Sequence, residues 1–403
     1  MHIILTNKYI IFFCFSFFFF TTIYSQDSVH IKNNNIDFVD VFRKIFIKNA
    51  PPRKDTGNVK TGKLHASVLP AAQYTLQTGI AFSIVANAAF YTSNDSTANI
   101  SSVLTSINYT QKNQFFMPIQ GNFWTKGNKV NILTDWHFEK YPQPTYGLGG
   151  YTSLANGYNI NYTYIRMYQT FFKTIKPDVY VGLGYNLDYY WNVEETNPPT
   201  GVITDFEKYG LSKTSIASGV TFNFLYDKRR NSINPNSGAY INISLRENAI
   251  FLGSNNNWSS LLIDARKYFQ LSNTNTILAF WTYDWFTVSG KAPYLNLANT
   301  ACDTYLNMGR GYIQGRYRGQ NLLYFESELR FKILQNGLIG GVVFANAQSY
   351  TEPITNKFQT ISPACGVGLR FKLNKFSKTN IAFDWGYSKD GLVGPFFNLG
   401  EVF

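Results

Sequence analysis

The chain has 403 residues and a formal net charge of +12, and it is rich in aromatic residues (17%) but poor in charged ones (15%). Soluble domains carry about 25% charged residues, and disordered chains are poor in aromatics, so this composition excludes intrinsic disorder. With three cysteines, it also excludes a disulfide-rich scaffold. High aromatic content without long apolar runs in the body of the chain favours a β-barrel that spans a membrane.

Residues 1–26 predict a secretory signal peptide. Lys8 precedes an apolar run over 9–20, and small or polar residues follow up to Gln26. The run is shorter than the roughly 20 residues that a membrane-spanning helix needs. We therefore expect cleavage near Gln26 and export of the mature chain. Its two remaining cysteines, Cys302 and Cys365, are expected to be free thiols, and a disulfide between them is the alternative.

Residues 27–63 predict a short periplasmic helix and a linker ahead of the body of the chain, 64–403. An amphipathic helix is expected over Asp37–Lys48, because four apolar residues recur at helical spacing: Phe38, Phe42, Ile45 and Phe46. We expect this helix either to pack on or plug the periplasmic end of a barrel, or to dock a partner. The segment is shorter than the roughly 50 residues of a domain, so no separate periplasmic domain is expected here.

From residue 64 onward, apolar and polar residues alternate with the period of two that is typical of β-strands. In 128–140, for example, Ile132, Trp136 and Phe138 alternate with Asp135 and His137. In a water-soluble sheet the polar face would point outward, whereas in a membrane barrel the apolar face points to lipid and the polar face to the lumen. Aromatic residues on the apolar faces and the predicted export favour the membrane arrangement.

Sixteen segments show this pattern, and they predict an all-β fold: a 16-stranded antiparallel transmembrane β-barrel with a short N-terminal helix. The longer connections, 141–157, 193–212 and 289–318, follow the fifth, seventh and eleventh segments, so all emerge on one side, which we take as extracellular. The segments are 64–71, 77–91, 97–109, 112–124, 128–140, 158–172, 178–192, 213–226, 237–249, 258–271, 275–288, 319–333, 337–350, 361–373, 378–388 and 394–403.

The connection 289–318 carries a motif, Arg310-Gly311-Tyr312, that resembles the sixth-loop motif of the BamA/TamA-like superfamily of outer-membrane barrels, also called bacterial surface antigen barrels. Family barrels have sixteen strands with this loop between the eleventh and twelfth, where the motif stands here. The resemblance covers about 64–403. It includes the C-terminal strand signal, whose residues here are Phe397, Gly400 and Phe403.

The resemblance implies that this loop enters the lumen, where Gly311 lets the backbone approach the wall. Polar groups buried there must be paired, and the guanidinium of Arg310 suits carboxylates. The expected partners on the lumen wall are Glu326, Glu328, Asn346 and Asp384. Asn346 stands where the family usually has an aspartate, so we expect it to accept a hydrogen bond and a glutamate to supply the charge. A solvated extracellular loop is the alternative.

Catalytic motifs are absent from the sequence. There is no Gly-x-Ser-x-Gly, P-loop, GxGxxG, CxxC or HExxH, so we expect no enzyme activity, cofactor or metal. Asp135, His137 and Glu139 share one strand face, which is expected to line the lumen rather than to bind a metal. Export argues against nucleic acid as a partner of this basic chain.

The resemblance implies a bacterial outer-membrane protein that assists the insertion or translocation of outer-membrane or surface proteins. Clients would use a seam between the first and last strands, and Pro70 favours a weak seam because proline lacks a ladder donor. Expected partners are lipid, client barrel proteins, and a periplasmic or outer-membrane protein that supplies the family's repeat domains, which 27–63 cannot hold. The alternative is a passive pore or a structural barrel subunit of a larger outer-membrane complex.

Overall fold

The computed structural model describes residues 35–47, 65–75, 78–93, 98–229, 231–271, 276–375 and 378–403. The predicted signal peptide and most of the predicted linker lie outside these residues. The elements described below all belong to one compact unit, Asn35–Phe403. No helix among the described residues is long and apolar enough to cross a membrane.

The fold is all-β and mostly antiparallel, with 19 strands in the described residues, 17 of them in one sheet. The sheet contains β1 (His65–Thr75), β2 (Gly79–Tyr91), β3 (Ile100–Thr110), β4 (Phe115–Trp124), β5 (Val130–Lys140), β6 (Gln143–Thr145), β7 (Tyr158–Lys176), β8 (Val179–Thr196), β9 (Thr214–Asp227), β10 (Gly238–Asn248), β11 (Trp258–Leu271), β12 (Thr276–Gly290), β15 (Asn321–Lys332), β16 (Ile339–Tyr350), β17 (Ser362–Asn374), β18 (Thr379–Ser388) and β19 (Val393–Leu399). The α-helices are α2 (Phe38–Phe46) and α3 (Asp205–Gly210), and four short 3₁₀ turns are η1 (Lys126–Asn128), η2 (Leu154–Asn156), η3 (Ile250–Leu252) and η5 (Tyr294–Asn296).

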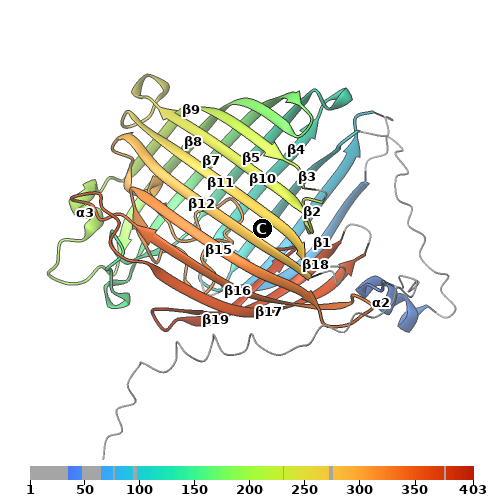
Figure 1. Cartoon of the computed structure of the whole chain (residues 1–403). Helices are drawn as coiled ribbons and strands as arrows, with labels where there is room; N and C mark the ends of the chain where they lie inside the picture. Colours follow the sequence, from blue (N-terminus) through green and yellow to red (C-terminus); the bar gives the residue numbers. More distant parts are fainter. Residues whose placement is uncertain are drawn as a thin grey trace, which may run out of the picture. The chain divides into compact units, whose positions relative to one another are not determined.

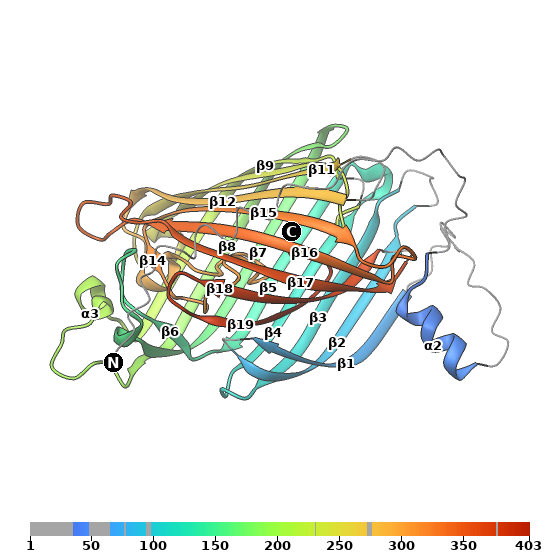
Figure 2. The ribbon, with the colours of Figure 1, turned by 60° about the horizontal axis from the view of Figure 1, so that its bottom comes forward.

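Each long strand pairs antiparallel with the next long strand along the chain, and β6 pairs with β7 beyond the end of β5. The strands lie side by side and curve round a central space, which we call the lumen (Figures 1 and 2). The two ends of the succession, β1 and β19, lie close to each other.

The alternation along the strands is opposite to that of a water-soluble sheet. On β15, Glu326 and Glu328 are almost fully buried, whereas Phe325, which directly precedes Glu326, is 50% exposed. The same holds on β17, where Arg370 is buried and Val367 is exposed. Charged side chains therefore face the lumen and apolar ones face outward, which is the pattern of a barrel in lipid.

Longer connections gather at one end of the sheet, where α3 lies, and the other end has short turns (Figure 1). The segments predicted from alternation each overlap one long strand, and their ends agree within four residues. Three short strands were not expected: β6, β13 (Ala298–Asn299) and β14 (Arg318–Gly319). The last segment was predicted too long, because β19 ends at Leu399 rather than at residue 403.

Candidate functional site: loop six inside the lumen

The connection between β12 and β15, residues 291–320, is called loop six here. It contains η5 and a two-stranded ribbon of β13 and β14, extended by hydrogen bonds between Thr300 and Tyr317 (N to O, 3.0 Å) and between Gly315 and Thr300 (N to O, 3.0 Å). Loop six thus has its own backbone pairing, and its tip carries the Arg310-Gly311-Tyr312 motif.

Arg310 is 2% exposed and lies among three carboxylates of the sheet. Its guanidinium forms ion pairs with Glu326 and Glu328 of β15, and its Nη1 lies 2.5 Å from Asp384 Oδ2 on β18. The guanidinium carbon is 3.8 Å from the ring centroid of Phe344 on β16, a cation–π contact. The structure therefore brings the motif arginine together with three of its four predicted partners.

Asn346, the fourth predicted partner, lies on β16 and contacts the backbone of the motif instead of its guanidinium. Its Nδ2 donates to the carbonyl oxygen of Arg310 at 2.9 Å. Asn346 is thus a donor here, where an acceptor was expected, and the expectation is corrected. An amide suits this position because a backbone carbonyl needs a donor, which a carboxylate does not offer.

Two further arginines of the wall extend this cluster. Arg330 on β15 donates to Glu328 (2.7 Å), and Arg370 on β17 pairs with Asp384 (2.5 Å) and with Glu401 (2.7 Å). Three guanidinium groups therefore meet four carboxylates in the space around the loop tip, so the charges nearly balance. We call these seven residues the lumen ion cluster: Arg310, Glu326, Glu328, Arg330, Arg370, Asp384 and Glu401.

Glycine allows the loop backbone to touch the wall. Gly311 has a φ of +102°, and a Cβ built on Gly386 of β18 would lie 2.7 Å from the Gly311 nitrogen and 2.8 Å from its Cα. Real Cβ atoms do not approach backbone so closely, so both positions need glycine. The tip is held against β18 by backbone contact as well as by charge.

Tyrosines fix the tip on both sides. The hydroxyl of Tyr312 donates to the carbonyl oxygen of Pro363 (2.8 Å), and the backbone N–H of Gly309 donates to the hydroxyl of Tyr324 (3.0 Å). Tyr324 in turn donates to Glu326. The tip is thus tied to β15 and β17 by hydrogen bonds, none of which needs water.

The second half of loop six is anchored to two other connections. Arg316 Nε donates to Asp390 in the β18–β19 turn (2.6 Å), and its Nη2 donates to the carbonyl of Thr152 (2.7 Å). The hydroxyl of Tyr317 also donates to Asp390 (2.9 Å). Loop six thus bridges the lumen from the end of β18 to the connection after β6.

The residues of the predicted C-terminal strand signal occupy different places. Phe397 lies on β19, faces outward and packs on Phe383 with ring centroids 4.8 Å apart. Gly400 follows the strand with a φ of +105°, which redirects the chain. Phe403 is 4% exposed and packs in the lumen on Trp281, with centroids 5.2 Å apart, so it is not part of β19.

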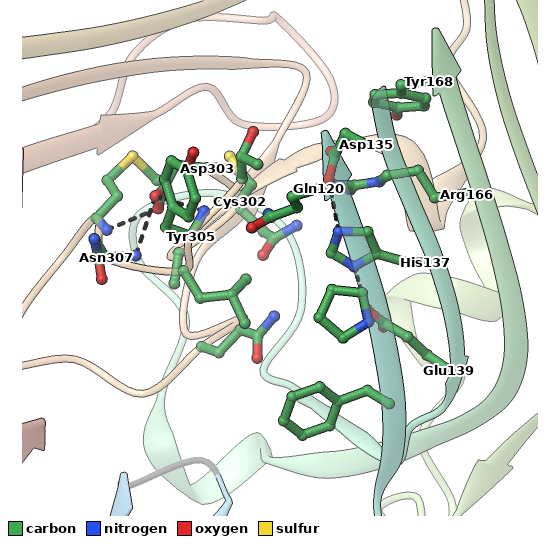
Figure 3. Close-up of a pocket in the computed structure, with 18 of the residues that line it drawn as sticks. Gln120, Asp135, His137, Glu139, Arg166, Tyr168, Cys302, Asp303, Tyr305 and Asn307 are labelled. Carbon is green, nitrogen blue, oxygen red and sulfur yellow. Dashed lines mark hydrogen bonds and ion pairs between the residues drawn. The ribbon is translucent and has the colours of Figure 1, made fainter. Parts of the chain in front are cut away.

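A lumen cavity of about 690 Å³ lies between residues 301–308 of loop six and the strands β5, β7 and β8. Figure 3 shows Asp303 and Tyr305 of loop six on one side and His137 on the other. His137 hydrogen-bonds to Asp135 (2.8 Å) and Glu139 (2.9 Å), and the described residues contain no cluster suited to hold a metal ion. On the β5 side of the cavity, the histidine and the two carboxylates thus pair with one another.

Burial also affects two acidic groups of loop six. It raises the pKa of the Cys302 thiol to about 12. It also raises the pKa of the Asp303 carboxyl. The effect of burial prevails although backbone N–H groups of loop six donate to this carboxyl, among them the N–H of Met308 at 2.8 Å.

In the described chain Cys302 and Cys365 form no disulfide with each other, since Cys302 lies in loop six and Cys365 faces outward on β17.

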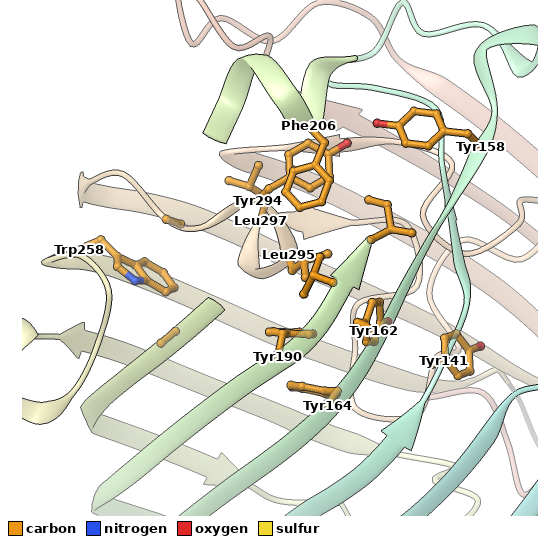
Figure 4. Packing of buried hydrophobic residues seen from close by; sticks show 14 residues of the cluster. Tyr141, Tyr158, Tyr162, Tyr164, Tyr190, Phe206, Trp258, Tyr294, Leu295 and Leu297 are labelled. Atoms are coloured by element: carbon orange, nitrogen blue, oxygen red, sulfur yellow. The ribbon is translucent and has the colours of Figure 1, made fainter. Parts of the chain in front are cut away.

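The start of loop six packs into an aromatic cluster (Figure 4). The ring of Tyr294 stacks on Phe206 of α3 at 4.5 Å, and that of Tyr164 on β7 stacks on Tyr190 of β8 at 4.2 Å. Apolar packing thus holds the base of loop six, while the ion cluster holds its tip.

Replacing Arg310 with alanine should destabilise the folded protein by about 3–5 kcal/mol, because Glu326 would lose its only ion-pair partner in the described chain and four buried carboxylates would share two guanidinium groups. To measure this, samples are heated to a series of temperatures before they are loaded on a gel. The midpoint is the temperature at which half of the folded, fast-migrating band is lost. Arg266→Ala, which removes a wall arginine paired to Asp264 on its own strand, is the matched control. Equal midpoints for wild type and Arg310→Ala would contradict the lumen placement.

Gly386→Ala should loosen loop six by about 1–3 kcal/mol, because the new methyl group would meet loop backbone that cannot move aside cheaply. Limited proteolysis of folded protein should then cleave within 300–317. Gly341→Ala on β16 is the control, since its methyl would meet the ring edge of Phe331, a side chain that can shift. Similar protease resistance of both variants would show that the close contact between Gly386 and the backbone of Gly311 does not hold loop six in place.

Comparison with known proteins identifies the family. Residues 124–401 match the model of the Omp85 superfamily domain. Solved structures with a similar fold include BamA from Haemophilus ducreyi lacking POTRA domains 1-3 (14% identity, TM-score 0.57, 83% of this chain and 70% of that one). They also include CdiB from Acinetobacter baumannii (10%, 0.51, 81% and 56%) and CdiB from Escherichia coli (8%, 0.54, 87% and 62%).

This chain therefore spans less than two thirds of the length of either CdiB chain. No curated protein matches the sequence. At 8–14% identity the structural likeness concerns the fold alone. The family model, in contrast, covers well over half of the chain, and the chain belongs to the Omp85 superfamily of outer-membrane β-barrel proteins.

Proposed function

We propose that this protein assists the insertion or translocation of outer-membrane or surface proteins through a seam between β1 and β19. Membership of the Omp85 superfamily supports the general role, since family barrels act on client proteins together with partner proteins. In this proposal the sixteen long strands (β1–β5, β7–β12 and β15–β19) form the barrel wall. The short-turn end faces the periplasm, where a partner presents clients.

The proposal rests on how the two end strands are paired. β1 pairs with β2 and β19 pairs with β18, and the two strands lie close together. Within the described residues, however, no register pair joins β1 to β19. Each therefore has a strand edge that another chain can extend by β-augmentation.

The sequences of the two strands support a weak junction. Pro70 lies within β1 and Pro395 within β19, and proline has no backbone N–H to donate to a neighbour. β19 also has only 7 residues, against 10 in β18 beside it. Each proline thus removes one donor from the two edges, and the short β19 limits the length over which they could pair.

Loop six supplies the rigidity that such a seam requires. Arg310 pairs with carboxylates on β15 and β18 and its carbonyl accepts from β16, so one loop holds three strands of the wall. In our proposal this brace keeps the C-terminal half of the wall in place when β19 separates from β1.

The test is client folding in liposomes that contain the purified protein. An unfolded client barrel should fold several-fold faster than in empty liposomes, read from its heat-modifiable migration on a gel. No acceleration by correctly folded protein would overturn the insertase proposal and favour a passive pore or a structural subunit.

A reversible lock tests the seam itself. Val68→Cys on β1 is combined in turn with Phe397→Cys and Leu399→Cys on β19, all of which face outward, after Cys365→Ser removes the native outward thiol. Oxidation of a pair that cross-links should reduce client folding to the rate in empty liposomes, and reduction should restore it. A pair of cysteines on β15 and β16, Leu323→Cys and Ser349→Cys, which are register partners, is the control. Undiminished acceleration by the locked seam would contradict this route.

A further inference from the structure

Helix α2 is attached to the sheet by its polar N-terminal turn. The backbone N–H of Ile36 donates to the carbonyl of Asn336 (3.1 Å), and that of Lys375 donates to Asp37 (2.8 Å). Lys375 Nζ also pairs with Asp40 at 2.8 Å. These contacts join the helix start to the β15–β16 and β17–β18 turns, at the short-turn end of the sheet.

The apolar face of α2 points away from the protein. Phe38 and Phe42 are each 52% exposed, Ile45 is 69% and Phe46 is 68% exposed. Phe42 and Phe46 contact each other, with ring centroids 4.4 Å apart, which keeps the face continuous. An amphipathic helix that rests on its own protein buries its apolar side and exposes its polar side. Here the polar side carries the attachment, so the apolar face requires another environment.

The place of α2 indicates what that environment is. The helix lies against β17, beside the wall at the end opposite α3 (Figures 1 and 2). The outward face of the sheet at this end is apolar as well, with Ile333 50% exposed, Ile381 38% and Leu399 64%. In an outer-membrane barrel this outward face contacts lipid. The exposed face of α2 therefore continues the lipid-facing surface of the strands.

The charges of the helix fit a lipid interface. Arg43 and Lys44 lie in its last turn, on the side away from the phenylalanines. A short helix with aromatic residues on one side and cations on the other lies in the plane of a membrane surface, with its apolar side among the acyl chains and its cations at the phosphates.

We propose that α2 is an interfacial anchor that inserts Phe38, Phe42 and Phe46 into the phospholipid leaflet at the short-turn end, next to β17. The salt bridge of Asp40 with Lys375 sets its depth, because it fixes the polar side of the helix at the rim of the wall. This inference rests on the outer-membrane location and does not depend on the client function.

The test uses the full chain with its native thiols replaced (C14S, C302A and C365S) and one new cysteine, F46C, labelled with the fluorophore NBD. The protein is folded into vesicles of phosphatidylcholine and phosphatidylglycerol, with or without lipids that carry a nitroxide near the headgroup. The nitroxide should quench the probe at residue 46 at least about threefold more than a probe at K44C on the polar side. Adding F42E should abolish the difference.

A probe at Y151C, at the opposite end of the sheet and 73% exposed, reports the quenching of a water-exposed site. The heat-modifiable gel shift confirms that every variant is folded. Equal quenching at residues 46, 44 and 151 would overturn the proposal and leave a periplasmic protein as the partner of this face. Protection of the probe at residue 46 from the nitroxide, if it is lost when the protein is diluted with lipid, would also overturn the proposal. That result would indicate that a second copy of the chain covers this face.

Discussion

The buried guanidinium of Arg310 is the constraint on which the C-terminal half of the structure depends. A guanidinium that is buried away from water must be paired with carboxylates that the fold holds in place. These carboxylates come from β15 and β18, which are far apart along the chain. Glu326 and Glu328 can pair with Arg310 only if both side chains face the lumen. A shift of β15 by one residue would turn them to lipid and Phe325 to the lumen, so the ion cluster and the apolar outer face demand the same register.

Two groups of buried ion pairs lie in the lumen, one around the tip of loop six and one near β7 and β8. Around the tip of loop six, charge and hydrogen bonds dominate, and glycine at 311 and 386 lets the backbones touch. Near β7 and β8, stacked rings such as Tyr164 on Tyr190 lie beside a second group of buried charges, in which Arg246 Nη1 is 2.6 Å from Asp188 Oδ2. The cavity of about 690 Å³ lies between these regions, so loop six divides the lumen into a packed side and an open side.

The sequence predicted much of this arrangement, because period-two alternation specifies both where strands run and which side chains face inward. It placed Glu326, Glu328 and Asp384 on the lumen side, and the motif supplied Arg310. Arg330 and Arg370 have the same inward phase, yet alternation alone does not say which inward charges meet the loop.

Other features depended on contacts that carry no local signal. The C-terminus resembles a family strand signal that ends in an aromatic residue, so the strand was expected to run to residue 403. In the structure Glu401 pairs with Arg370 and Phe403 packs on Trp281, and these distant partners draw the chain inward after Gly400. For α2, helical spacing defined an apolar face but could not say whether the protein or another medium covers it.

The position of the motif in the chain also determines an order of events. Arg310 precedes β15, β16 and β18 in the chain, and its carboxylate and backbone contacts lie on those later strands. The tip of loop six therefore cannot be fixed before these strands are in place, whereas the base of the loop can already pack on α3. Its tip becomes fixed only after β18 has joined, when Gly386 and Asp384 arrive together. Fixing the tip thus depends on a contact between Arg310 and Asp384, which are 74 residues apart in the chain, and contacts of such long range are slow to form.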